Sequence, residues 1–330
     1  MTNERLAEKA LAILHGKSEK ALKKAKELIL KEEFRCQKAR EALKYYVSTW
    51  NDTTRPGVLA LAYEAVGGKP REVIPLQTAM LFIDAAMDIH DDIIDKSTIK
   101  GSKETLYGKF GEEIALLIGN AFLVKGFTQL YKITEKLPLN RKKMINDAVK
   151  KFLFEVIDAH AQESVLKIDK WNVEPDEYLK VLEQKAADIE GHACVGAIFG
   201  GGSAKEIKAL SMYGKCLGTL LTVRSEFIDI YEPSELRGRT EHECFPLPLL
   251  YVLKNENFRP KIQQILLNKK IGENEINELL EIVYSIPEFA TLKQYIKRLE
   301  HKASKSLAII PKKNNKDTLK FFVDAALEDL

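Results

Sequence analysis

Apolar residues recur every three to four positions through nearly every long segment of this 330-residue chain. This spacing is typical of helices with one buried face, and no segment shows the sustained alternation of apolar and polar residues that marks a strand. Proline and glycine separate the helical segments. The breaks fall at 51–56, 67–70, 136–138, 173–175, 200–203, 233, 246–248 and 311–315. The pattern therefore predicts about ten helices and an all-α fold.

No segment repeats another, and no flexible linker divides the chain. We therefore expect one large helical bundle and not several separate domains. In this interpretation residues 36–330 form the bundle, and residues 1–35 form a lysine-rich helical extension. Lysine and glutamate are interspersed in the extension, which is typical of an exposed helix face with i, i+4 ion pairs.

Composition narrows the class of protein. Hydrophobic residues make up 45% and charged residues 30% of the chain, as in a globular protein with a large core. The net charge of +3 gives no electrostatic reason to expect nucleic-acid binding. Four widely spaced cysteines lack the pattern of a zinc site or a disulfide framework, which favours a reducing, cytoplasmic location.

Targeting and membrane signals are also weak. The first residues lack the charged-then-apolar layout of a signal peptide. Charged residues interrupt the apolar runs, and we expect none to approach the ~18 residues of a transmembrane helix. The sequence therefore predicts no transmembrane segment.

One predicted helix, over 81–95, carries five carboxylates on a single face. At about 100° per residue, these positions fall within an arc of roughly 100°. Carboxylates at i, i+3 and i+4 repel one another unless a cation neutralises them. Oxygen ligands select hard divalent cations, and Mg²⁺ typically takes one or two carboxylates with water and phosphate oxygens. The five residues are Asp84, Asp88, Asp91, Asp92 and Asp95.

An acidic face that is merely solvated is the alternative. The flanking residues weaken it, because 81–83, 85–87 and 93–94 make most of the remaining helix surface apolar. Such a helix is buried on most sides. An acidic stripe on a buried helix indicates the wall of a cavity, which favours metal binding.

A second acidic cluster lies near the end of a later helix. Glu226 and Asp229 are one turn apart and Ser225 lies on the same side, so three oxygen ligands are able to converge. Surface acids at an ordinary helix end are an equal alternative for this cluster alone. Together, two acidic helices facing each other across a bundle would form a polynuclear metal site that clamps a polyphosphate.

Several motifs occur in a characteristic order along the chain. They are Arg55-Pro56, Gly67-Gly68, His90-Asp91-Asp92-Ile93-Ile94-Asp95, Lys185-Ala186-Ala187, Arg224 to Asp229, and Phe245-Pro246-Leu247-Pro248-Leu249. In this order they resemble the polyprenyl (trans-isoprenyl) diphosphate synthase family of the class I isoprenoid synthase superfamily. The resemblance covers roughly residues 36–330.

This resemblance implies a helical bundle around a central cavity, and a prenyltransferase of isoprenoid biosynthesis that ionises an allylic prenyl diphosphate. It implies Mg²⁺ as the cofactor, three ions with substrate bound, and a homodimer or a heterodimer with a related synthase. The implied metal ligands are Asp91, Asp95, Ser225, Glu226 and Asp229.

Other roles follow from the same resemblance. The implied catalytic residues are Asp91, Asp92, Asp95 and Lys185. Diphosphate binding is expected of Arg55, Lys100, Lys185, Arg224 and Arg239. A chain-length pocket is expected at Ile83, Ala86 and Met87. The small Ala85 and Ala86 before the first motif favour a long prenyl chain.

The chain also departs from the family pattern. Asp52 stands where the family has a lysine for the second, isopentenyl diphosphate, and Asp84 stands where it has a histidine for the same group. Ile99-Lys100 replaces an arginine pair, and Ser225 and Glu226 replace the leading aspartates of the second motif. The losses cluster on the side of the second substrate.

Three functions are compatible with this combination. The first is a prenyltransferase that elongates an allylic diphosphate, resembling a geranylgeranyl diphosphate synthase. The second is a terpene-synthase-like enzyme that ionises one prenyl diphosphate and needs no second diphosphate site. The third is a non-catalytic regulatory subunit of a prenyl diphosphate synthase. Fold alone does not choose among them.

Overall fold

The computed structural model describes residues 5–101, 103–268, 271–311 and 315–328, and it confirms the predicted all-α fold. The chain divides into two compact units. The first comprises Met1–Val149, His192–Ile207 and Ile310–Asn315, and the second comprises Lys150–Gly191, Lys208–Ile309 and Lys316–Leu330.

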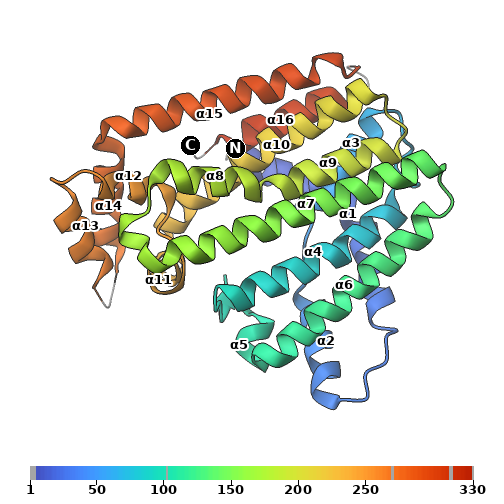
Figure 1. Ribbon diagram of the computed structural model, residues 1–330, viewed down its shortest axis with the longest axis horizontal. Coiled ribbons are helices and arrows are strands. Elements are labelled where there is room, and N and C mark those ends of the chain that lie inside the picture. The colour runs from blue at the N-terminus through green and yellow to red at the C-terminus, as the bar shows by residue number, and fades with distance from the viewer. Residues whose placement is uncertain (1–4, 102, 269–270, 312–314, 329–330) are drawn as a thin grey trace. The chain divides into compact units, whose positions relative to one another are not determined.

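The first unit is built from the N-terminal helices (Figure 1). These are α1 (Leu6–Ile29), α2 (Gln37–Thr49), α3 (Thr54–Ala65), α4 (Ile74–Ile94), α5 (Leu106–Phe110) and α6 (Glu112–Thr134), with strands β1 (Ile99–Lys100) and β2 (Lys103–Glu104). Helices α7 (Leu139–Leu166), α9 (Ala187–Phe199) and α10 (Ala204–Tyr231) contribute residues to both units.

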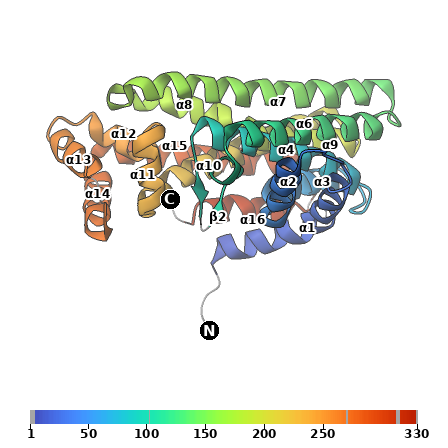
Figure 2. The ribbon, with the colours of Figure 1, turned by 90° about the horizontal axis from the view of Figure 1, so that it is seen from below.

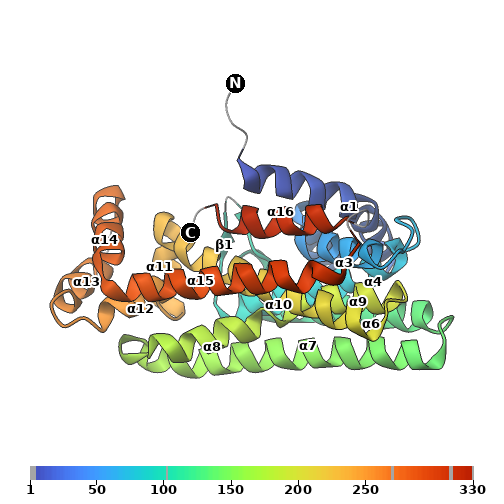
Figure 3. The same cartoon turned by 90° about the horizontal axis from the view of Figure 1, so that it is seen from above.

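The remaining elements belong to the second unit, where α15 and α16 lie side by side (Figure 3). They are the 3₁₀-helix η1 (Lys167–Asn172), α8 (Pro175–Lys185), α11 (Pro233–His242), α12 (Leu247–Leu253), α13 (Arg259–Leu266), α14 (Glu273–Ser285), α15 (Pro287–Ser306), the 3₁₀-helix η2 (Leu307–Ile309) and α16 (Asp317–Ala326).

The described residues form sixteen α-helices where about ten were expected. Short breaks divide segments that the periodicity had joined. Pro287 opens α15 directly after α14, and Gly111, with φ of 83°, separates α5 from α6. The two-residue strands β1 and β2 form an antiparallel hairpin that was not predicted, because strands this short show no alternation.

Helix α1 covers most of the predicted N-terminal extension, yet it is part of the core of the first unit. It packs on α3 and α4 (Figure 2), and Ala21, Ala25 and Ile29 are completely buried. Its lysines lie on the other faces, as the pattern predicted. The division into residues 1–35 and 36–330 stays a prediction.

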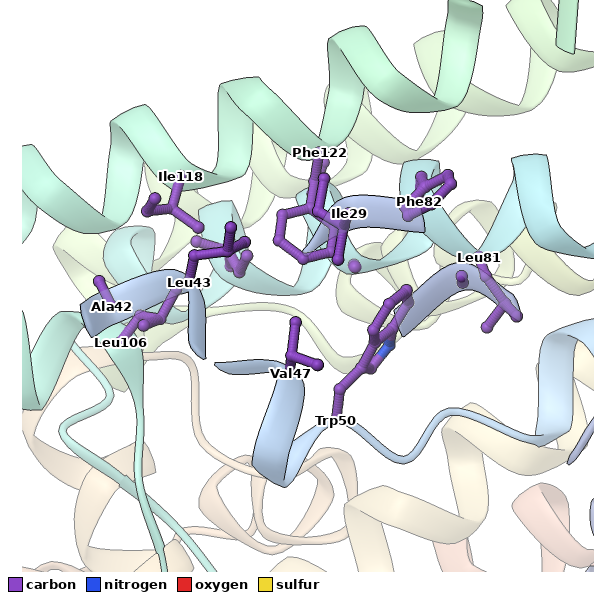
Figure 4. Packing of buried hydrophobic residues seen from close by; sticks show 14 of the residues in the cluster. Ile29, Ala42, Leu43, Val47, Trp50, Leu81, Phe82, Leu106, Ile118 and Phe122 are labelled. Atoms are coloured by element: carbon purple, nitrogen blue, oxygen red, sulfur yellow. The ribbon is translucent and has the colours of Figure 1, made fainter. Parts of the chain in front are cut away.

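An aromatic cluster stabilises the core of the first unit (Figure 4). The Phe122 ring on α6 makes edge-to-face contacts with Trp50 at 5.3 Å and with Tyr46 at 5.1 Å between ring centroids. Such pairs add to the free energy gained by burying the rings. The cluster joins α2, α4 and α6 through Phe82, and so anchors the helix that carries the first acidic motif.

Two glycines of α6 let it approach α4 closely (Figure 1). A Cβ atom on Gly126 would lie 2.6 Å from Ile83 Cγ1 and 3.2 Å from the Ala79 carbonyl oxygen. A Cβ atom on Gly119 would lie 2.6 Å from His90 Nε2. His90 therefore faces α6, consistent with a packed histidine.

Helix α6 corrects one expectation about the chain. It is long and apolar enough to cross a membrane by length and composition, so the apolar runs are less interrupted than predicted. Lys125, the charge in its middle, forms an ion pair with Glu32. Only 33% of this apolar window is buried, and α6 packs against α2, α4 and α5. One such helix is weak evidence for a membrane span.

Candidate active site

The first acidic motif lies at the C-terminal end of α4. Residues 76–86 of this helix are buried, as predicted for a helix enclosed on most sides, whereas Asp88, Asp91, Asp92 and Asp95 are half-buried. The helix ends because Lys96 adopts a left-handed φ of 53°. The carboxylates therefore lie where the buried helix reaches solvent.

The β-hairpin returns the chain to this motif. Lys100 Nζ lies 3.2 Å from Asp92 Oδ1, and so forms an ion pair with the middle aspartate. Burial raises the pKa of Asp92 to about 6 despite the opposing effect of Lys100. The predicted diphosphate-binding Lys100 is thus within reach of the first acidic motif.

Arg55 is held between two carboxylates. Its Nε donates to Asp52 Oδ2 at 2.9 Å, and its Nη2 donates to Asp88 Oδ2 at 2.5 Å. Burial raises the pKa of Asp52 to about 6, with Arg55 opposing and Asp84 and Asp88 reinforcing the increase. Arg55, predicted to bind a diphosphate, is therefore engaged by acidic residues of its own unit.

Asp84 is paired with a histidine that the sequence did not single out. Asp84 Oδ2 lies 3.0 Å from His192 Nε2, and the two residues are 2% and 0% exposed. They are 108 positions apart in the chain. No local spacing signals such a pair.

A buried charged network lies in the second unit. Glu163 forms an ion pair with Lys185 and accepts a hydrogen bond from the Tyr178 hydroxyl at 2.9 Å. Burial alone would raise the pKa of Glu163, but Lys185 and Arg239 outweigh it and lower the pKa to about 2. The predicted catalytic Lys185 thus has a carboxylate partner.

Arg239 is the centre of the same network. Its Nη2 donates to Glu226 Oε1 at 2.9 Å and to Oε2 at 3.0 Å, and its Nη1 donates to Asp229 Oδ2 at 3.1 Å. Nη2 also donates to the Tyr178 hydroxyl at 2.7 Å. Burial raises the pKa of Asp229 to about 7, against the opposing effect of Arg239 and with that of Glu226.

The three predicted oxygen ligands of the second cluster are in different environments. Ser225 is exposed and its hydroxyl donates to the Leu221 carbonyl oxygen at 3.2 Å. Glu226 is 3% exposed and bound by Arg239, and Asp229 is half-buried. Arg224, on the same helix, is also half-buried. The structure brings Glu226 and Asp229 together around Arg239, while Ser225 makes its hydrogen bond elsewhere.

The residues predicted for a chain-length pocket precede the first motif on α4. Ile83 and Ala86 are completely buried and Met87 is half-buried. Ile83 packs against α6 at Gly126. Ala86 belongs to the core cluster of α1, α2, α4 and α6. Their role in chain length stays a prediction.

The donor chemistry of the first motif fits a divalent cation. Among the residues that the structure describes, no three His, Cys, Asp or Glu side chains form a ready metal cage. Mg²⁺ does not need three protein ligands, because it keeps several waters and is bound by one or two carboxylates plus substrate phosphates. Asp91 and Asp95, one turn apart, supply that donor set. The second cluster fits less well, since Arg239 already neutralises it.

Comparison with known proteins assigns the chain to a family. Residues 36–283 match the polyprenyl synthetase family model. The chain belongs to the polyprenyl synthetase family. This membership confirms the resemblance seen in the motifs, and with it the assignment as a prenyltransferase.

One curated relative is similar in sequence, and two solved structures share the fold. The chain is 28% identical over 260 residues to the geranylgeranyl diphosphate synthase of Methanosarcina mazei, covering 78% of each protein. The structure of geranylgeranyl pyrophosphate synthetase from Pyrococcus horikoshii has a TM-score of 0.83 at 24% identity, covering 97% of this chain and 98% of that one. A Caulobacter crescentus polyprenyl synthase, complexed with calcium and isoprenyl diphosphate, has a TM-score of 0.77 at 16% identity, covering 96% and 97%.

Proposed function

We propose that this polyprenyl synthetase is a Mg²⁺-dependent prenyltransferase that acts on an allylic prenyl diphosphate, with a product in the geranylgeranyl range. The observation that carries the proposal is the first motif, whose Asp91, Asp92 and Asp95 lie at the solvent-facing end of an otherwise buried helix. A long product agrees with the relative from Methanosarcina mazei and with the small Ala85 and Ala86.

Each motif residue has a proposed role in binding the metal or the diphosphate. Asp91 and Asp95 would hold Mg²⁺, and Asp92 would support them through its ion pair with Lys100. Bound Mg²⁺ would stabilise the negative charge of the departing pyrophosphate. Lys185 and Arg224 would bind the diphosphate, for which Lys185 would exchange its contact with Glu163. The predicted total of three ions would require ligands from the second cluster as well.

A second candidate function is ionisation of a single prenyl diphosphate, as in a terpene synthase. The observation that favours it is the engagement of Arg55 by Asp52 and Asp88, beside the buried pair of Asp84 and His192. These carboxylates would repel a second diphosphate. A regulatory subunit without catalysis, which the sequence also allowed, enters only as an outcome of the assay that follows.

One assay separates the three functions. The purified chain is incubated with Mg²⁺ and either farnesyl or geranylgeranyl diphosphate, with and without isopentenyl diphosphate, and pyrophosphate release is measured. Release that requires both substrates supports prenyl transfer. Release from the allylic substrate alone supports the terpene-synthase-like reaction. No release in any arm, with co-purification of a related synthase, supports the regulatory subunit.

We also propose an association through α6. Its exposed side carries Leu117, Val124 and Tyr131 at seven-residue spacing, and these side chains are 59%, 67% and 58% exposed. Such a stripe is typical of helices that pack against a second chain. We propose a homodimer, or a heterodimer with a related synthase. A cytoplasmic location agrees with the four free cysteines.

A further inference from the structure

Arg239 occupies the centre of the second acidic cluster. Its guanidinium contacts both oxygens of Glu226, at 2.9 and 3.0 Å, and Oδ2 of Asp229 at 3.1 Å. Glu226 and Asp229 lie one turn apart on α10, which is the spacing that led the sequence to predict a metal site there. The positive charge between these two carboxylates is therefore the guanidinium of Arg239 itself.

The guanidinium has little capacity left for a further ligand. Arginine carries five N–H donors, and all three of its nitrogens are engaged. Beyond the carboxylates, Nη2 donates to the Tyr178 hydroxyl at 2.7 Å and Nε donates to the Cys244 carbonyl oxygen at 3.0 Å. Glu243 Oε2 lies 3.4 Å from Nε. Arg239 is therefore placed to hold carboxylates, and this geometry does not support its predicted role in binding a diphosphate.

The Glu226 carboxylate likewise has partners for both of its oxygens. Its side chain is 4% exposed, and besides Arg239 it accepts a hydrogen bond from the Leu247 backbone N–H at 2.8 Å. The Tyr178 hydroxyl lies 3.3 Å from its Oε1. A buried carboxylate needs both a counter-charge and hydrogen-bond donors, and Glu226 has both. A divalent ion here would have to displace a positive charge that cannot diffuse away.

We propose that Arg239 is a built-in counter-ion that replaces a divalent metal at the second acidic cluster, so that this chain binds metal only at the first motif. Arg239 acts as a positioning residue, because it fixes Glu226 and Asp229 and binds the Cys244 carbonyl oxygen. Glu226, held by Arg239, in turn accepts from the Leu247 N–H in the segment that follows α11. The metal stoichiometry of this chain is then lower than the three ions that the resemblance implied. The part concerning the first motif rests on the proposed function.

The test counts bound Mn²⁺, a spectroscopic substitute for Mg²⁺, by electron paramagnetic resonance with and without inorganic pyrophosphate. We expect Asp229→Asn to bind as many ions as the parent. We expect Arg239→Gln to bind one ion more, because it leaves Glu226 and Asp229 without their counter-charge. Arg237→Gln, an exposed arginine of the same helix, is the matched control and leaves the count unchanged.

The inference is overturned if Asp229→Asn binds fewer ions than the parent, or if folded Arg239→Gln gains none. A purely structural role for Arg239 would produce no additional ion. Should circular dichroism show that Arg239→Gln is unfolded, Asp229→Asn and Glu226→Gln decide the question. If the parent binds no Mn²⁺ at all, the proposed function fails, whereas the gain in Arg239→Gln still tests the role of Arg239.

Discussion

At the scale of single residues, the charges picked out by the motifs are mostly held by partners within the same unit. Arg55 lies between Asp52 and Asp88, Lys185 contacts Glu163, and Arg239 contacts Glu226. Helical spacing correctly placed Asp84, Asp88, Asp91 and Asp92 on one helix, which ends at Ile94, just before Asp95. It did not show most of the partners, because they lie on other helices: Asp88 on α4 binds Arg55, and Glu226 on α10 binds Arg239. Asp52 is the exception, three positions before Arg55. The sequence therefore predicted the candidate ligands but not which of them are already neutralised.

The acid sensitivity of the second unit tests one of these pairs. The pKa of Glu163 is lowered from 4.5 to about 2, so its stabilising effect is complete above pH 4.5 and is lost as the pH falls toward 2. The lowered pKa of Glu163 corresponds to a contribution on the order of 3 kcal/mol to the free energy of unfolding. We expect Glu163→Gln to be less stable at neutral pH and to lose less stability on acidification than the parent. Urea unfolding at a series of pH values measures both effects.

Glu177→Gln, an exposed position on α8, is the matched control and should follow the parent. Equal acid sensitivity of Glu163→Gln and the parent would show that Lys185 and Arg239 do not stabilise the ionised carboxylate.

At the scale of elements, periodicity identified the helices and the burial of α4 but not every helix boundary. Breaks such as those before Leu106 and Pro287 depend on a few residues, and the hairpin of β1 and β2 is too short to give a pattern. The close approach of α6 to α4 was also not predicted. It depends on Gly119 and Gly126 meeting His90 and Ile83, a contact that becomes visible only when both helices are placed.

Gly126→Ala tests whether this close approach matters. The added Cβ would overlap Ile83 and the backbone of α4, so we expect the variant to lose about 1–3 kcal/mol of its free energy of unfolding. Gly16→Ala on α1 is the control, since nothing lies within 4 Å of its Cβ and alanine is the better helix former. Chemical denaturation compares them. Equal stability of Gly126→Ala and Gly16→Ala would contradict the packing described for α4 and α6.

At the scale of the whole molecule, the exposed stripe on α6 is the clearest sign of a larger assembly. We expect Val124→Lys to shift the protein from dimer to monomer, because burying a charge in an apolar interface is costly. Leu11→Lys, at an exposed apolar position of α1, is the control that should leave the assembly unchanged. Light scattering coupled to size-exclusion chromatography measures the mass. A parent chain that is monomeric would exclude the homodimer and leave a related synthase as the partner.

Family membership establishes a prenyltransferase. We propose that the first motif of α4 performs metal-dependent release of pyrophosphate from an allylic prenyl diphosphate. The direct measurement compares this release, with Mg²⁺ and farnesyl diphosphate in the presence of isopentenyl diphosphate, between the parent and the double variant Asp91→Asn with Asp95→Asn. Asp147→Asn, at an exposed position of α7, is the control. We predict that the parent and the control release pyrophosphate only when Mg²⁺ is present, and that the double variant is slower by at least about 100-fold. Release by the folded double variant at the parental rate would contradict the account.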